Sequence, residues 1–429
     1  MKFIAAGDAI IQRRIQSDFK GYDELTPYIN SADARFFNLE TTLNREGECP
    51  GSQFSGGTYL RTEPEVLDDL MKFGFNMTSF NNNHAMDFSY EGLNATLDTL
   101  NKSEIVHAGV GHNLAEASAP AYLETSAGRV ALIALNSSFK APMMAGNQSP
   151  RVKGRAGING LRLESHLTVT REELDFIRDL GERTGINVQK TIEAKEGYHP
   201  MTADNEAKLG ELKFVLGEKS EYVTRIDPRD IERVKRSIFE AKLQADYVII
   251  SVHSHELSGD AKENPSQFLI DFAHTCIDCG ANAVIGHGPH LLRPVEVYNG
   301  CPIFYSLGDF TLQLYSVNFA PADFFERHGL TDQYTVHELL AKRSANFTRG
   351  LMTDRRMFIS VLPIWEAEDG KLTKLRFVPI ELAMEGNKSE IGLPRLVRPE
   401  AVIDYFAKMC EPYGITLTAA EDGLIDCKW

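Results

Sequence analysis

Side chains that bind metals or move protons recur in this chain directly after short apolar runs. One such stretch is VIGHGPH, residues 284–290, where two imidazoles follow an apolar pair in a segment too rich in Gly and Pro to form a helix. The candidate residues of this kind are Asp8, Glu40, Asn83, His84, His253, His287 and His290. Carboxylate, amide and imidazole groups suit Mn, Zn or Fe better than they suit thiophilic metals. The set therefore predicts a site for metal binding or for acid–base chemistry.

Each candidate also has a purely structural interpretation when it is taken alone. Asp8 follows a glycine and could be a turn residue, and Glu40 could pair with a surface cation. His253 could be a hydrogen-bonded histidine of the core. These interpretations weaken when the residues are considered together, because turn and core residues have no reason to recur at successive strand ends.

The elements that must position these residues alternate between strand-like and helical runs. Strands are expected at residues 2–8, 33–40, 129–138, 245–253, 282–288 and 301–310, and another runs into an Asn-rich loop at 75–87. Helices are expected at residues 63–74, 89–104, 227–244 and 265–280. This alternation is typical of an α/β fold. Ligands in such folds gather beyond the carboxyl ends of strands, so five strand ends with ligand-type side chains predict one shared site.

Two parts of the chain depart from this rhythm. Residues from about 140 to 225 are Gly-rich, basic and polar, and we interpret them as an insertion over the mouth of the site. Residues 358–382 predict a β-hairpin with EDGK at its turn. We therefore expect a single domain over residues 1–429 with this insertion. A C-terminal β-hairpin and helical extension, residues 311–429, would pack on the core.

Composition narrows the class of protein. The net charge of -15 and the pI near 5.3 argue against binding to a nucleic-acid backbone, which needs a basic face. Six cysteines are scattered, and the pair Cys276 and Cys279 lacks the second pair that a zinc ribbon needs. This usage predicts free thiols in the cytoplasm. The apolar run Phe3–Ala6 is too short for a signal peptide, and no stretch is long enough to span a membrane.

Six stretches resemble the CapA-type family. They are GDAIIQRR, NLETTL, FNNNHAMDFSYEGLNATLDTL, HAGVGHN, GANAVIGHGPH and PIFYSLGDF, and they follow one another from Met1 to about Phe310. Members of this family are called capsule or poly-γ-glutamate biosynthesis proteins and share the metallophosphatase (calcineurin-like) fold. The resemblance therefore implies an α/β protein with a two-sheet sandwich flanked by helices (α-β-β-α).

The resemblance also implies roles for individual residues. Metallophosphatases bind two metal ions, and Asp8 resembles their first Asp while Glu40 takes the place of the bridging Asp. The other matching ligands are Asn83, His253 and His290. His84 would be the general acid, and Asp87 resembles an acidic residue that orients it.

Two departures from the metallophosphatase pattern concern ligands. Ile10 stands where Asp-x-His has its histidine, and Gly288 stands where His-x-His has its first histidine. Three ligands then remain on each side, namely Asp8, Glu40 and His290 for one ion and Glu40, Asn83 and His253 for the other. Three protein ligands and water can hold a catalytic metal. The residues that could replace the lost ligands are His255, Glu256 and His287. One ion, two ions or none thus remain open.

Three functions are compatible with this sequence. The first is a metal-dependent hydrolase of a phosphoester or of an amide, such as a γ-glutamyl or peptide bond. Arg13, Arg14 or Arg155 would then hold a phosphate or carboxylate of the substrate. The second is a metal-independent peptide epimerase that uses the same carboxylates and imidazoles as acids and bases. The third is a non-catalytic component of polymer export.

Overall fold

The first apolar run forms strand β1 (Lys2–Ile10), which lies inside a ten-stranded sheet. Its side chains alternate between two hydrophobic clusters, with Ile4 and Ala6 in one and Phe3 and Ala5 in the other. Successive side chains of a strand point to opposite faces of the sheet. Both faces of this sheet are therefore covered, which explains why the strand is apolar almost throughout.

The ten-stranded sheet is mixed. Its strands are, in spatial order, β23 (Thr416–Ala419), β24 (Ile425–Lys428), β21 (Lys371–Leu382), β20 (Ile359–Glu368), β1, β2 (Ala34–Leu39), β5 (Met77–Ser79) and β6 (Val106–Ala108). In addition, β19 (Asp309–Leu312) pairs with β1 and β22 (Pro394–Leu396) pairs with β21. The strands β1, β2, β5 and β6 run parallel, so their carboxyl ends share one edge of the sheet.

A six-stranded sheet packs on the face of the first sheet that bears Phe3 and Ala5. Its order is β17 (Val295–Tyr298), β18 (Cys301–Phe304), β16 (Ala283–His287), β15 (Tyr247–His253), β9 (Gly128–Asn136) and β8 (Ala121–Thr125). The inner four strands are parallel. Apolar residues of both sheets, including Phe36, Leu132 and Trp365, form one core between them.

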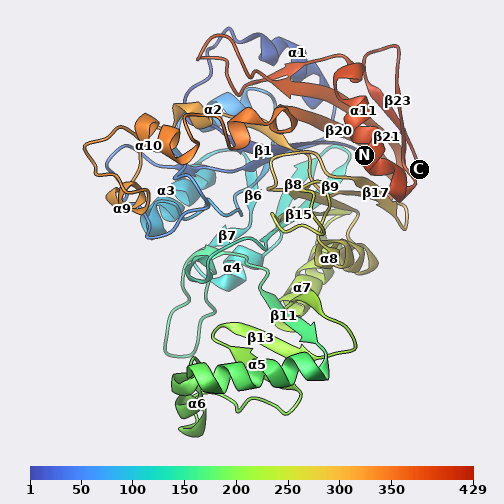
Figure 1. Ribbon diagram of the computed structural model, residues 1–429. Coiled ribbons are helices and arrows are strands. Elements are labelled where there is room, and N and C mark those ends of the chain that lie inside the picture. Colours follow the sequence, from blue (N-terminus) through green and yellow to red (C-terminus); the bar gives the residue numbers. More distant parts are fainter. The chain divides into compact units, whose positions relative to one another are not determined.

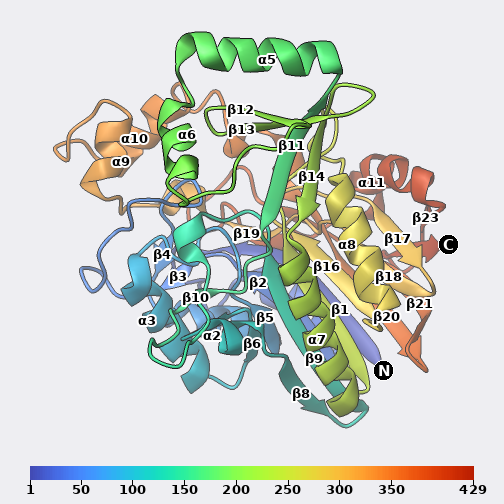
Figure 2. The same cartoon turned by 90° about the horizontal axis from the view of Figure 1, so that it is seen from below.

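Helices cover the outer faces of both sheets. On the first sheet, α1 (Lys20–Ile29), α2 (Val66–Met71) and α3 (Ser89–Lys102) contribute leucines to the cluster that contains Ile4. On the second, α7 (Pro228–Gln244) and α8 (Gln267–Asp278) lie along β9, β15 and β16 (Figures 1 and 2). The predicted α/β class and the two-sheet sandwich flanked by helices are confirmed.

Shorter elements complete this part of the chain. The helices are α4 (Leu114–Ser118), α9 (Ala322–Arg327), α10 (Val336–Arg343) and α11 (Ile403–Cys410). The short strand pairs are β3 (Thr42–Leu43) with β4 (Arg61–Thr62) and β7 (Val110–Gly111) with β10 (Gly157–Ile158). Strands β20 and β21 form a hairpin whose turn, Asp369–Gly370, has positive φ at both residues, as Asp-Gly turns favour. No helix is both long and apolar enough to cross a bilayer.

The computed structural model describes all residues, 1–429, and contains two compact units. The sandwich unit comprises Met1–Gly160 and Glu232–Trp429, and the second unit comprises Leu161–Ile231. The second unit begins and ends later than the predicted insertion at about 140–225, whose position over the site mouth stays a prediction.

The second unit has a sheet and a small core of its own. Its sheet has the order β12 (Glu206–Leu209), β13 (Leu212–Leu216), β11 (Leu163–Val169) and β14 (Glu221–Ile226). Helix α5 (Arg171–Thr184) begins with a capping box between Thr170 and Glu173, and α6 (Val188–Lys195) follows it. Leu174 and Phe214 lie in the core between α5 and the sheet.

Candidate metal centre

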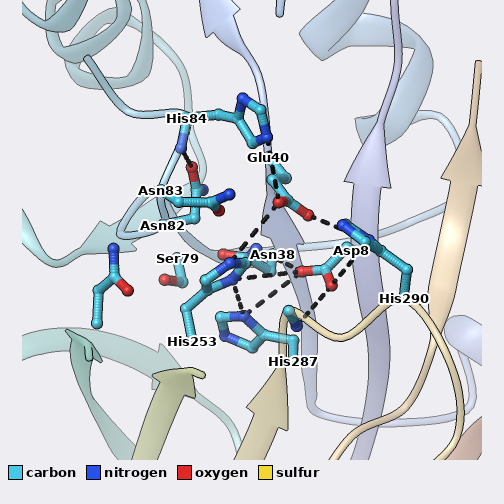
Figure 3. Close-up of polar contacts among 12 residues, drawn as sticks. Asp8, Asn38, Glu40, Ser79, Asn82, Asn83, His84, His253, His287 and His290 are labelled. Carbon is cyan, nitrogen blue, oxygen red and sulfur yellow. Dashed lines mark hydrogen bonds and ion pairs between the residues drawn. The ribbon is translucent and has the colours of Figure 1, made fainter. Parts of the chain in front are cut away.

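Polar side chains from both sheets meet at the carboxyl ends of parallel strands (Figure 3). Asp8 lies within β1, Glu40 follows β2, and Asn83 and His84 follow β5. His253 ends β15, and His290 lies in the loop after β16. The structure thus brings together the residues that the sequence places at successive strand ends.

One group of ligand atoms surrounds the carboxylates of Asp8 and Glu40. The ligand atoms of Asp8, Glu40, His290 and Asp309 all lie within 4.8 Å of one another, and all four residues are buried. Nδ1 of His290 lies 3.9 Å from Oδ2 of Asp8 and 3.8 Å from Oε2 of Glu40. Asp309 is therefore a fourth candidate ligand on this side, in addition to the three that were expected.

Asp309 is the site residue that the sequence analysis missed. It begins β19, which pairs with β1 in parallel so that Asp309 stands opposite Asp8. The two strands approach closely at Gly7 and Gly308, where a Cβ on Gly7 would lie 1.8 Å from the carbonyl oxygen of Gly308. The repeated Gly-Asp pair, each preceded by an apolar run, was the available signal.

A second group of ligand atoms lies on the other side of Glu40. The ligand atoms of Glu40, His253 and His255 lie within 4.8 Å of one another. Nε2 of His253 is 3.7 Å from Oε1 of Glu40 and 3.1 Å from Nε2 of His255. Asn83 donates its amide N–H to the carbonyl of Gly56 at 3.2 Å, and its oxygen is buried without a partner. His255 thus stands beside the two ligands expected on this side, His253 and Asn83.

Glu40 is shared by the two groups. Both of its carboxylate oxygens are buried, and neither has a hydrogen-bond partner. Oδ2 of Asp309 is buried and unpaired in the same way. An unpaired carboxylate inside a protein is costly unless a cation or hydrogen-bond donors compensate it. The N and O donor set and these orphaned oxygens together fit a cation, so the buried cluster could hold a metal ion.

The pKa shifts within the cluster also favour metal binding. Burial raises the pKa of the Asp8, Glu40 and Asp309 carboxyls, and their mutual repulsion raises those of Asp8 and Glu40 further. Burial, with neighbouring imidazoles, lowers the pKa of His253 and His255 well below the ordinary value. The two imidazoles are then neutral, which is the form that binds metals.

His287 orients the candidate ligand His253. Its Nε2 contacts Oγ of Ser251 at 2.7 Å, and its Nδ1 contacts Nδ1 of His253 at 2.9 Å. Although Asp8, His253 and His287 form a third group with metal-ligand spacing, both ring nitrogens of His287 already have partners. The contact with His287 engages Nδ1 of His253 and leaves its Nε2 facing Glu40.

Asp8 and His290 are also held in place. Asn38 donates its side-chain N–H to Oδ1 of Asp8 at 2.7 Å, and the backbone N–H of Gly288 donates to Oδ2 at 2.8 Å. The carboxylate of Asp309 contacts Nδ1 of His290 at 3.0 Å. His290 has φ of 61°, a conformation that is rare without glycine and that often marks functional loops.

His84 and Asp87 form a buried pair. Nδ1 of His84 lies 2.6 Å from Oδ2 of Asp87, which also accepts the backbone N–H of Leu60 at 2.8 Å. The other oxygen of Asp87 accepts the N–H of Gly56 at 3.0 Å. Nε2 of His84 faces Oε1 of Glu40 at 3.8 Å. The carboxylate can therefore hold a proton on Nδ1 of His84 and orient Nε2 toward the centre.

Glu256, which the sequence analysis considered as a replacement ligand, does not lie among the candidate ligands. Its Oε2 accepts hydrogen bonds from the hydroxyls of Ser137, Ser138 and Ser254 at 2.8, 2.8 and 2.9 Å. Ser138 in turn accepts the backbone N–H of His255 at 2.7 Å. Glu256 thus organises the loop that carries His255, and it is absent from the groups with metal-ligand spacing.

The three expected arginines are not brought to the centre. A cavity of about 350 Å³ opens beside His84 and His290, and a second cavity lies beside Asn83 and His255. Neither is lined by Arg13, Arg14 or Arg155. Arg14 instead pairs with Asp69 at 2.6 Å. Two other arginines, Arg343 and Arg349, line the first cavity.

Comparisons with known proteins identify the family. Residues 2–313 match the model of a family described as bacterial capsule synthesis protein PGA_cap. The uncharacterized protein y4sH of Sinorhizobium fredii (strain NBRC 101917 / NGR234) is 32% identical over 97% of this chain and 90% of its own length. The PGA biosynthesis protein CapA of Bacillus subtilis (strain 168) is 24% identical over 71% of this chain and 61% of its own length. A hypothetical protein from Thermus thermophilus has a TM-score of 0.41 and 12% identity, covering 89% of this chain and 99% of that chain. The predicted CapA-type resemblance is confirmed, and the chain belongs to the PGA_cap family of bacterial capsule synthesis proteins.

Proposed function

We propose that this protein is a metal-dependent hydrolase in which Glu40 would be a ligand common to two groups of residues that could each hold a divalent ion. The carboxylate of Glu40, buried and without a hydrogen-bond partner between two groups of ligands, is the observation that carries the proposal. Asp8, His290 and Asp309 would hold one ion, and His253, His255 and Asn83 the other. Mixed N and O ligands favour Mn, Zn or Fe. Such ions, when bound, lower the pKa of a coordinated water and polarise the bond to be cleaved.

The role proposed for the chain's own residues follows from the pair of His84 and Asp87. Nδ1–H of His84 donates to Asp87, so Nε2 is the nitrogen that faces the centre, and His84 would act as the acid in its doubly protonated form. During hydrolysis the oxygen of water bonds to phosphorus or to a carbonyl carbon while the bond to the leaving atom breaks. The leaving atom takes its proton from Nε2 of His84, and Asp87 stabilises the charged imidazole beforehand.

The substrate is proposed as a phosphoester or an amide, including a γ-glutamyl or peptide bond. The link to poly-γ-glutamate or capsule biosynthesis rests on the names of the family and of its relatives. The cytoplasm is proposed as the location because all six cysteines are free thiols.

The alternative hypothesis is metal-independent epimerisation. The sequence supports it because each of the two expected metal sites lacks one histidine of the metallophosphatase pattern. Asp309 and His255 now stand beside these two positions, so the geometry supports the hydrolase better. Epimerisation therefore remains as an outcome of the experiment rather than as a second proposal.

The experiment uses protein stripped of metal and reloaded with Mn, Zn or Fe. Release of nitrophenol from p-nitrophenyl phosphate and bis(p-nitrophenyl) phosphate, and of nitroaniline from γ-glutamyl p-nitroanilide, reports hydrolysis. We expect turnover of at least one substrate by loaded protein, and its loss with EDTA. Hydrolysis of none of them, together with exchange of peptide α-hydrogens into heavy water by EDTA-treated protein, would replace the hydrolase by an epimerase.

A further inference from the structure

The cavity of about 350 Å³ lies beside the proposed general acid. It meets the centre at Asn83, His84, His255 and His290. The rest of its lining includes Lys262 and residues of the segment 314–353, which contains α10. Because the leaving atom must reach Nε2 of His84, the group that departs would lie in this cavity.

The cavity is lined by positive charges, although the chain as a whole is negatively charged. The chain has 60 acidic and 45 basic residues, yet the residues that line this cavity include three cations and no Asp or Glu. The cations are Lys262, Arg343 and Arg349, and none of them forms an ion pair. Arg343 is fixed from one side, since its Nη1 donates to the hydroxyl of Thr58 at 2.7 Å. Arginine groups held in this way match the geometry of carboxylates and phosphates.

Much of the remaining lining of the cavity is apolar. The apolar residues include Leu257, Leu314, Tyr315, Leu340, Phe347 and Met352. The rings of Tyr315 and Phe347 lie 6.0 Å apart. Cavities of this size with apolar walls and a few charged groups are typical of small-molecule sites.

The backbone that carries Phe347 is strained. Helix α10 ends at Arg343, and the next turn places Ala345, Asn346 and Phe347 at φ of 50°, 57° and 58°. Residues other than glycine rarely adopt this left-handed conformation, because Cβ then crowds the following carbonyl oxygen. Strain of this kind persists where a turn serves a site. The turn sets Phe347 and Arg349 against the same cavity.

We propose that this cavity binds the leaving group of the substrate and selects one that has a flat apolar body with a second anionic group at its far end. The apolar body would pack against Tyr315 and Phe347, and the anionic group, a carboxylate or another oxyanion, would reach Arg343 and Arg349. This assignment rests on the proposed hydrolase function, because it takes His84 as the group that faces the leaving atom.

Binding without turnover tests the assignment. Calorimetry with manganese-loaded full-length protein would compare 4-phosphonobenzoate with 4-phosphonobenzamide, which has the same shape but lacks the distal charge. A third ligand, 4-sulfophenylphosphonate, shows whether a tetrahedral oxyanion is accepted as well. We expect the carboxylate to bind about tenfold more tightly than the amide, a difference of about 1.4 kcal/mol, because a charge-assisted contact is stronger than a neutral one.

Variants locate the source of the preference. The double variant Arg343→Gln with Arg349→Gln should bind the two benzoate-shaped ligands equally within error. Arg327→Gln is the matched control, because Arg327 is an exposed arginine of α9 that does not line the cavity, and it should keep the full preference. Equal affinities in the wild type, a preference that survives the double substitution, or failure of all three ligands to bind would overturn the assignment.

A parallel turnover assay separates this proposal from the hydrolase. It uses the corresponding phosphate esters, 4-carboxyphenyl and 4-carbamoylphenyl phosphate, and measures released phosphate. A binding preference without turnover would support the cavity and reject the hydrolase. Turnover with no preference between the two esters would reject the cavity and support the hydrolase.

Discussion

Replacing Glu40 by Gln exchanges a buried carboxylate for an uncharged amide of nearly the same shape. If two ions share this carboxylate, the substitution weakens both sites. At a metal concentration about 100 times Kd, one bound ion stabilises the folded state by about 2.7 kcal/mol. A direct ligand contributes at least the 100-fold in affinity that outer partners can contribute, and such a loss leaves about 0.4 kcal/mol per ion. The variant should therefore lose about 4–5 kcal/mol of metal-dependent stability.

Without metal, the effect of Glu40→Gln on the free energy of unfolding should change sign. Glu40 then has a buried carboxylate with no hydrogen-bond partner, which costs about 1–3 kcal/mol and which the amide relieves in part. Glu40→Gln should be as stable as the wild type in EDTA, or more stable. Urea unfolding of both proteins, in EDTA and in saturating Mn or Zn, measures the two differences.

Glu296→Gln is the matched control for this comparison. Glu296 is a carboxylate of β17 that contacts His274 at 2.9 Å and Tyr305 at 2.6 Å, and it lies outside the metal-ligand groups. Its substitution should lower stability by the same amount with metal and with EDTA. The reasoning would be refuted if Glu40→Gln behaved like this control, or if metal left the wild-type curve unmoved over a wide concentration range.

Three further expectations concern single residues. Asp309→Asn should remove the ion on the side of Asp8 and leave the other, so metal analysis should give about half of the wild-type content; full content would exclude Asp309 as a ligand. His84→Ala should abolish turnover while leaving metal content intact, and full activity on the true substrate would reject its role as the acid. Hydrogen bonds from Arg229 lower the pKa of Asp227 to about 2, so its contribution to stability is present above its ordinary pKa of 3.8 and is lost as the pH falls toward 2. Asp227→Asn should flatten this acid-dependent loss in hydrogen exchange of β11 and β14, and an unchanged pH profile would show that the Arg229 pair contributes nothing.

Most of the fold could be predicted from local sequence patterns. The apolar runs that became β1, β9, β15 and β16 are buried on both faces, and such strands are conspicuous in a sequence. The Asp-Gly turn between β20 and β21 is a strong hairpin signal. The limits of the second unit were less visible, because its strands and helices are short and mostly exposed.

The candidate site was predictable where a ligand follows its own strand. Asp8, Glu40 and His253 were found in this way, because parallel strands bring their carboxyl ends together without further information. Asp309 was missed because it lies inside the strand predicted over residues 301–310, and only pairing with β1 shows that it stands opposite Asp8.

No local sequence pattern predicts which cations line the cavity. Arg343 and Arg349 come from a C-terminal segment that lies beside the site only through tertiary packing. Arg14 was one of three arginines expected to hold the substrate, but it lies beyond the end of β1 and pairs with Asp69.

The most direct test of the dinuclear centre is anomalous diffraction from crystals of the protein loaded with manganese. The account predicts two anomalous peaks, one on each side of the Glu40 carboxylate. The first should lie against Asp8, His290 and Asp309, and the second against His253 and His255. No peak at Glu40, or a single peak that Glu40 does not touch, would contradict it.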